Sequence, residues 1–255
     1  MTLTVPTVPA LRTSGVRDGI VSSFLRTPLL LAGTAVAAAI LTLAGWNWQA
    51  VGQVSVATFT AVNLLCWWIL ARRLRAEGRG FGDLLGRWRP ADLAWGLLWA
   101  VVLFVPFSVG LTLVATATAG GFGRIGEVFT PPVVLPGGPW MWAVAAVGLV
   151  FPFVNAPIEE LYYRGYAQGA FEASGRRAWA VWVPSVGFAI QHLFVAQSLA
   201  GIPAYLAAFF LWGLTAALIR RRHPRTLWPL VIAHVVTNLS FSVVPMVLLV
   251  TGQAA

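Results

Sequence analysis

Long apolar stretches without charge alternate along this chain with short stretches that are rich in arginine. No charged residue occurs between Arg26 and Arg72, or between Asp92 and Arg124. A membrane-spanning helix needs about 20 predominantly apolar residues, so the longest of these stretches can hold two spans. The predicted spans run from about Pro28 to Trp46, Val54 to Ala71, Leu93 to Ala115, Pro139 into the segment that holds Glu159, Trp179 to Ala196, Pro203 to Ile219, and Leu227 to Val250.

The fourth of these segments is interrupted by proline. From Pro139 to Ser174 it is too long for one straight crossing at about 1.5 Å per residue. Pro152 and Pro157 are expected to kink or break it. Asn155 is then the expected N-cap of a new helix, because a proline is well tolerated in a first turn.

The chain is predicted to be all-α, a polytopic transmembrane helical bundle. It has seven spans if the last segment is one helix, and eight if that segment divides at Pro245. Composition agrees, because 58% of the residues are hydrophobic and 10% are charged, whereas soluble domains carry about 25% charged residues. So few charges could not cover this much apolar surface, and the surrounding solvent is therefore expected to be lipid.

The basic residues indicate how the bundle is oriented. All 17 are arginine, and the net charge is +9. Alternate loops rich in arginine follow the positive-inside pattern, with the N-terminus cytoplasmic and a bacterial plasma membrane as the expected location. This explanation is preferred to nucleic-acid binding, which is not expected. The arginines attributed to cytoplasmic segments are Arg12, Arg17, Arg26, Arg72, Arg73, Arg75, Arg79, Arg87, Arg89, Arg176, Arg177, Arg220, Arg221, Arg222 and Arg225.

Three regions follow from this pattern. Residues 1–27 are expected to form a cytoplasmic N-terminal tail. Residues 28–135 are expected to form the N-terminal transmembrane helices with their arginine-rich cytoplasmic loop, and residues 136–255 a second transmembrane region. The first apolar segment is interpreted as an uncleaved span, because it is longer than the apolar region of a signal peptide.

Charges within the apolar segments need a partner or a function, because an ionisable group at mid-membrane is costly to insert. Glu159 and Glu160 are adjacent, and Arg164 follows Glu160 by four residues. Residues four apart share one face of a helix, so Glu160 and Arg164 are expected to pair. The other carboxylate is expected to stay unmatched, which suits a general base or acid.

Two histidines also lie within apolar segments. His192 follows Phe188 by four residues, and Asn238 follows His234 by four, so each pair is predicted to share a helix face. His223 lies among arginines and is interpreted as a solvated loop residue. Taken singly, a membrane histidine is more often a packing residue and an Asn an interhelical contact; the joint occurrence is what indicates a site.

The order Glu-Glu-x-x-x-Arg, Phe-x-x-x-His, His-x-x-x-Asn resembles the CPBP family of intramembrane proteases, which includes the type II CAAX prenyl endoproteases and bacteriocin-immunity-related proteins. The resemblance covers roughly Val150 to Ser240. It implies that residues 136–255 form a catalytic transmembrane core, with catalytic roles for six residues. These are Glu159, Glu160, Arg164, His192, His234 and Asn238.

The resemblance also implies what each residue does. Glu159 or Glu160 would activate a water for attack on a peptide carbonyl, and His192 would assist or hold that water. His234 and Asn238 would orient the nucleophile or stabilise the oxyanion. Arg164 would fix the carboxylates, and Phe188 would be a packing residue.

Whether a metal takes part stays open at this point. Glu160, His192 and His234 are of the types that bind catalytic Zn²⁺ with a water in the fourth position. The same residues would also serve a metal-free glutamate mechanism. The metal-binding signature His-Glu-x-x-His does not occur in the chain.

The expected function is therefore an intramembrane endopeptidase whose partners are membrane lipid and a membrane-associated protein or peptide substrate. Two alternatives remain: a non-proteolytic membrane scaffold or immunity protein of the same family, and a proton-coupled transporter, for which the expected repeat symmetry is not found. The arginines that flank the motifs favour an active site that faces the cytoplasm. The sequence does not indicate the oligomeric state.

Overall fold

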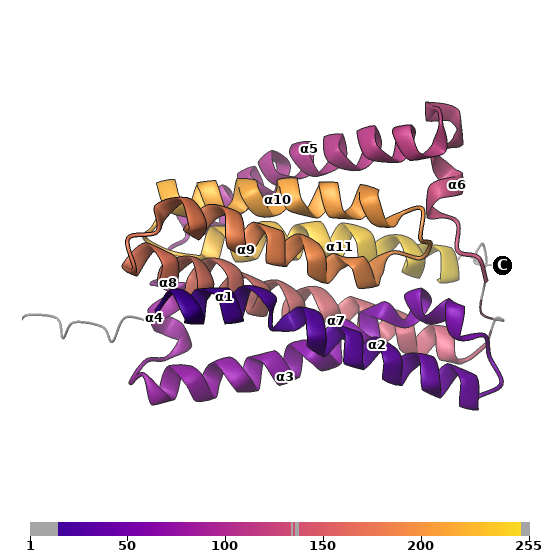
Figure 1. The fold of residues 1–255 in the computed structure, drawn as a ribbon, viewed down its shortest axis with the longest axis horizontal. Helices are drawn as coiled ribbons and strands as arrows, with labels where there is room; N and C mark the ends of the chain where they lie inside the picture. Colours follow the sequence, from indigo (N-terminus) through magenta and orange to yellow (C-terminus); the bar gives the residue numbers. More distant parts are fainter. Residues whose placement is uncertain (1–14, 134, 136–137, 251–255) are drawn as a thin grey trace, which may run out of the picture.

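A computed structural model describes residues 15–133, 135 and 138–250, with side chains described as far as Ser242. Every regular element in this part of the chain is helical, which confirms the all-α prediction (Figure 1). The elements are α1 (Val16–Phe24), α2 (Arg26–Leu43), η1 (Trp48–Val54), α3 (Ser55–Ala76), α4 (Phe81–Leu85), α5 (Ala91–Ala119), η2 (Phe122–Arg124), α6 (Ile125–Phe129), α7 (Trp140–Glu160), η3 (Leu161–Ala167), α8 (Gln168–Ala173), α9 (Arg177–Gln191), η4 (His192–Val195), α10 (Ile202–Arg222) and α11 (Trp228–Val250).

Six helical segments in the described part are long and apolar enough to cross a membrane. They correspond to the first six predicted spans. The predicted seventh segment forms α11, whose backbone is helical without interruption from Trp228 to Val250, so it does not divide at Pro245. The predicted total of seven or eight spans is not confirmed beyond these six. The six segments are Val16–Leu43, Trp48–Ala76, Ala91–Ala119, Trp140–Ala173, Arg177–Val195 and Ile202–Arg222.

The first span begins earlier than the sequence indicated. Residues 1–27 were expected to be a tail, but α1 lies within them and continues almost directly into α2. Residues 1–14 lie outside the described residues. The buried face of α1 includes Gly19, Ser22 and Ser23, and it packs on α9.

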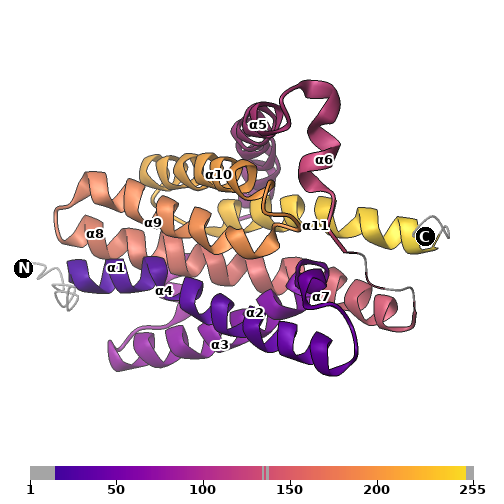
Figure 2. The same ribbon diagram turned by 45° about the vertical axis from the view of Figure 1, so that its right-hand side comes forward.

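Helix α7 lies between α3 and α11 and packs against both (Figures 1 and 2). It is helical through Pro152 and Pro157, so the break predicted at these prolines is wrong. Asn155 is consequently not an N-cap. It lies inside the helix, where its Oδ1 accepts a hydrogen bond from Asn63 Nδ2 at 2.8 Å. That contact from α3 satisfies a polar side chain that the membrane interior could not solvate.

The departure from regular geometry comes later, directly after the two glutamates. Residues Leu161–Ala167 form the π-helical turn η3, and all seven are buried. Single π turns inside α-helices are rare and are common at functional sites. The widened turn carries Arg164, and the chain then continues as α8.

Small residues allow these helices to approach closely, as is usual where lipid supplies no hydrophobic drive for helix association. Gly187 of α9 lies against the backbone of α1, and a Cβ at this position would lie 2.0 Å from the carbonyl oxygen of Ser23. Because that oxygen belongs to the backbone, it cannot turn aside as a side chain could. The α1–α9 contact therefore requires glycine here.

A Gly187→Ala substitution tests this contact. It is expected to lower the free energy of unfolding by about 1–3 kcal/mol or more, because an inserted methyl group forces α1 and α9 apart. The midpoint of thermal unfolding in detergent micelles measures the effect. Gly169→Ala on α8, where an added Cβ meets nothing within 4 Å, is the matched control and should leave the midpoint unchanged or raise it slightly. Equal midpoints for the two variants would contradict the proposed contact.

Candidate active site

The two glutamates at the end of α7 are completely buried, and each has a guanidinium partner. Arg164 Nη1 lies 3.2 Å from Glu160 Oε1, which confirms the pair predicted from their spacing. Arg26 Nη2 lies 2.7 Å from Glu159 Oε1. The prediction that one carboxylate would be unmatched is therefore wrong. Two negative and two positive charges balance inside the bundle.

Arg26 is the site residue that sequence reasoning missed. It was attributed to the cytoplasmic tail, but its side chain is fully buried where α2 begins. Its Nε also donates to Gln191 Oε1 at 2.5 Å, and Gln191 Nε2 donates to Glu159 Oε1 at 2.8 Å. Ser22 precedes Arg26 by four residues, and both side chains are buried. Two polar residues at this spacing, directly before the first apolar stretch, were the signal that could have revealed Arg26.

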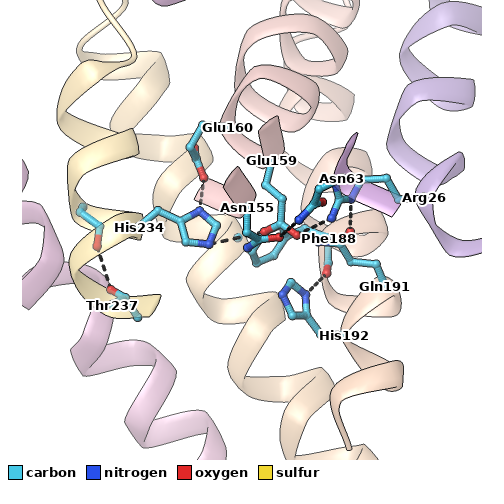
Figure 3. A network of polar contacts seen from close by, with 12 residues as sticks. Arg26, Asn63, Asn155, Glu159, Glu160, Phe188, Gln191, His192, His234 and Thr237 are labelled. Carbon is cyan, nitrogen blue, oxygen red and sulfur yellow. Dashed lines mark hydrogen bonds and ion pairs between the residues drawn. The ribbon is translucent and has the colours of Figure 1, made fainter. Parts of the chain in front are cut away.

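His234 lies between the two carboxylates (Figure 3). Its Nδ1 is 2.9 Å from Glu160 Oε1, and its Nε2 is 3.4 Å from Glu159 Oε2. Consecutive residues of a helix point about 100° apart. Glu159 therefore reaches Arg26 while Glu160 reaches Arg164, and one imidazole from α11 spans the gap between them.

His192 approaches from the end of α9, where it begins the short helix η4. Its Nδ1 lies 2.6 Å from the carbonyl oxygen of Phe188, so this nitrogen donates and the neutral ring keeps its lone pair on Nε2. The ring stacks on Phe209 at 3.5 Å between centroids. Its orientation is therefore set on one side by a hydrogen bond and on the other by an aromatic face.

Arg164 is held by aromatic rings as well as by Glu160. Its guanidinium carbon lies 4.4 Å from the centre of the Phe188 ring and 5.0 Å from that of Trp212. Its Nη2 also donates to the carbonyl oxygen of Gly213 at 3.2 Å. Phe188 is thus a packing residue, as predicted, and it contacts both the arginine of the first motif and the histidine of the second.

A cavity of about 550 Å³ lies against this cluster. His192, His234, Asn155 and Asn238 line it, whereas neither glutamate reaches its wall. Asn238 Nδ2 is buried and has no hydrogen-bond partner among the described residues. All six residues predicted for the site thus lie at the cavity or directly behind it. The imidazoles and amides face the cavity, and the carboxylates support them.

The positions of the donor atoms bear on whether this site could hold a metal. Both ring nitrogens of His234 face carboxylate oxygens, and His192 Nδ1 faces a backbone carbonyl. Within the described part of the chain, no three His, Cys, Asp or Glu side chains are grouped so that they could hold a metal ion. The set Glu160, His192 and His234 does not form a ligand shell in this geometry. Zn²⁺ as a cofactor stays a prediction.

The ion pair of Arg26 predicts a coupling of stability. Arg26→Gln should lower the free energy of unfolding by about 3–5 kcal/mol, because it leaves the Glu159 charge buried and unpaired. The double variant Arg26→Gln/Glu159→Gln removes both charges and should recover part of that loss. Thermal unfolding in detergent measures both variants, with exposed Arg17→Gln on α1 as the control. If the loss of stability in the double variant equals the sum of the losses in the two single variants, the pairing of Arg26 with Glu159 is contradicted.

The comparisons with known proteins support the interpretation of the second half of the chain. Residues 139–240 match the sequence model of a family described as type II CAAX prenyl endopeptidase Rce1-like. No curated protein and no solved structure matches the chain. The matched segment begins just before α7 and contains Glu159, Glu160, Arg164, His192, His234 and Asn238. This segment is thus similar to the CAAX-type intramembrane proteases of the CPBP family.

Proposed function

We propose that this protein is an intramembrane endopeptidase that hydrolyses a peptide bond of a membrane-associated substrate with an activated water. One observation carries the proposal: His234 is held between two buried carboxylates at the wall of a cavity that His192 also lines. Such a hydrolysis needs a proton acceptor beside the bound peptide. The cavity is large enough for a peptide segment, and these groups lie at its end. The similarity of residues 139–240 to a protease family supports the same reaction class.

The proposed proton acceptor is the pair Glu159–His234. Glu160 Oε1 accepts a hydrogen bond from His234 Nδ1, which leaves the lone pair of the neutral ring on Nε2. That nitrogen faces Glu159 Oε2 at 3.4 Å, so two acceptors oppose each other. A proton placed there is stabilised by both groups. Glu159 is thus assigned as the base, and Glu160 as the residue that positions His234.

The proposed water lies between this pair and His192. His192 Nε2 is an acceptor on a ring that lines the cavity, and Glu159 interacts electrostatically with both histidines. The water oxygen bonds to the substrate carbonyl carbon while its proton passes to Glu159–His234. The same proton then passes to the leaving amine as the carbon–nitrogen bond breaks, so the enzyme returns to its starting state.

The proposed oxyanion donor is Asn238. Its Nδ2 has no partner among the described residues and lies at the cavity, where an amide can donate to a negatively charged oxygen. Asn155 lines the same cavity and is held by Asn63. Arg26 and Gln191 both donate to Glu159 Oε1, which leaves Oε2 free to take the proton.

Cleavage assays test the reaction. Purified protein in proteoliposomes would be incubated with a library of apolar transmembrane peptides, and mass spectrometry would identify the products. Glu159→Gln and His192→Ala are each expected to lower the cleavage rate about 10²–10⁴-fold, the usual contribution of general acid–base catalysis. A parallel assay with a chelator, followed by added Zn²⁺, tests the predicted cofactor.

Two matched controls come from the same chain. Glu127→Gln changes a carboxylate that lies outside the spans, where hydrogen bonds from Arg124 hold its pKa below the usual value. His223→Gln changes an exposed histidine. Both should retain the wild-type rate. Cleavage that survives Glu159→Gln in a correctly folded protein would refute the proposed base.

Asn238→Ala tests the oxyanion donor separately. Removing one such donor is expected to lower kcat about 10²–10³-fold and to leave KM nearly unchanged, because the contact forms mainly in the transition state. Steady-state kinetics on one cleaved peptide measure the two constants. A rise in KM with constant kcat would instead assign Asn238 to ground-state binding.

A further inference from the structure

The cavity differs between its two ends. At the inner end its wall consists of Phe188, His192, Trp212 and His234, each 5% exposed or less. At the outer end the lining residues are more accessible, and Gln197 is exposed. Exposure therefore rises along the cavity in one direction, away from the charged cluster. The mouth lies at the outer end.

The outer end is built by segments from one end of the bundle. The lining there comes from η1, the first turns of α7 and the residues that follow η4. These segments join α2 to α3, begin α7 after the α6 connection, and join α9 to α10. In Figure 1 this is the end that carries α6. Its connections contain one arginine, Arg124.

The opposite end holds the arginine-rich connections. Six arginines lie between Arg72 and Arg89, two follow α8, and four lie between Arg220 and Arg225. Arginine-rich short loops are retained on the cytoplasmic side. The mouth of the cavity is therefore on the other, extracytoplasmic side of the membrane.

The lining also limits what can enter. Of the described residues that line the cavity, none is Asp, Glu, Lys or Arg. The wall is mainly apolar, and its aromatic side chains include Phe59, Phe107, Phe151 and Phe241. A charged substrate segment would lose its hydration here without gaining a partner. The cavity suits an uncharged, apolar segment.

We propose that the substrate is an uncharged apolar polypeptide segment that enters from the arginine-poor, extracytoplasmic face. This inference rests on the proposed function and names the substrate class of the proposed protease. The extracytoplasmic entrance differs from the sequence prediction, in which the active site faces the cytoplasm. That prediction used the distance of each motif from arginine anchors along the chain, which indicates depth in the membrane but not the direction in which a cavity opens.

Cysteine labelling in spheroplasts tests the orientation without any need for activity. The one native cysteine, buried Cys66, is first replaced by alanine. Met141→Cys and Gln197→Cys then place thiols at the mouth. Ala178→Cys places an exposed thiol beside the arginines at the other end. A membrane-impermeant polyethylene glycol maleimide is added before and after permeabilisation.

The expected result is labelling of Met141→Cys and Gln197→Cys in intact spheroplasts, and of Ala178→Cys only after permeabilisation. The reverse pattern, or mouth cysteines that never react, would overturn the proposal. Where the Cys66→Ala parent cleaves a peptide, external labelling of Met141→Cys should abolish that cleavage and leave the parent unaffected. Unchanged cleavage after full labelling would also overturn it. If the parent cleaves nothing, the proposed function fails, and the labelling still decides which face is open.

Discussion

The pairing of two carboxylates with two guanidinium groups is the condition on which this structure depends. One charged side chain at the bilayer centre costs about 2.5–3.5 kcal/mol on insertion scales, and this bundle buries four. Their charges cancel because Arg26 meets Glu159 and Arg164 meets Glu160. The partners come from the start of α2 and from the π turn after α7. The first span is therefore part of the site, although the family match begins only at residue 139.

The backbone of α7 makes this pairing possible. The helix stays regular through Pro157, so the adjacent glutamates point in directions about 100° apart and meet different arginines. The wider turn η3 then places the guanidinium of Arg164 against the rings of Phe188 and Trp212, which stack on each other. A guanidinium held over aromatic faces keeps a fixed position. Arg164 in this way fixes the position of Glu160, and Glu160 fixes the position of His234.

The motif residues could be predicted because polar side chains are conspicuous in apolar stretches. Glu159, His192 and His234 each interrupt such a stretch, and the structure brings all three together. Arg26 could not be found in this way, because an arginine at the edge of a span has an ordinary topological explanation. The breaks predicted at Pro152 and Pro157 failed for another reason. A proline removes one helical hydrogen bond, but neighbouring helices stabilise α7 on both sides, so the helix need not end there.

The charged cluster also separates a closely packed part of the bundle from the cavity. Toward the arginine-rich end, every residue of η3 is buried, and Tyr163, Arg164 and Phe188 pack against one another. Toward the other end, the same histidines border an open cavity. The proposed hydrolysis needs a path for water to the site, while the buried charges must stay paired. Aromatic rings pack against one side of the charged cluster, and the cavity lies on its other side, so both requirements are met in one bundle.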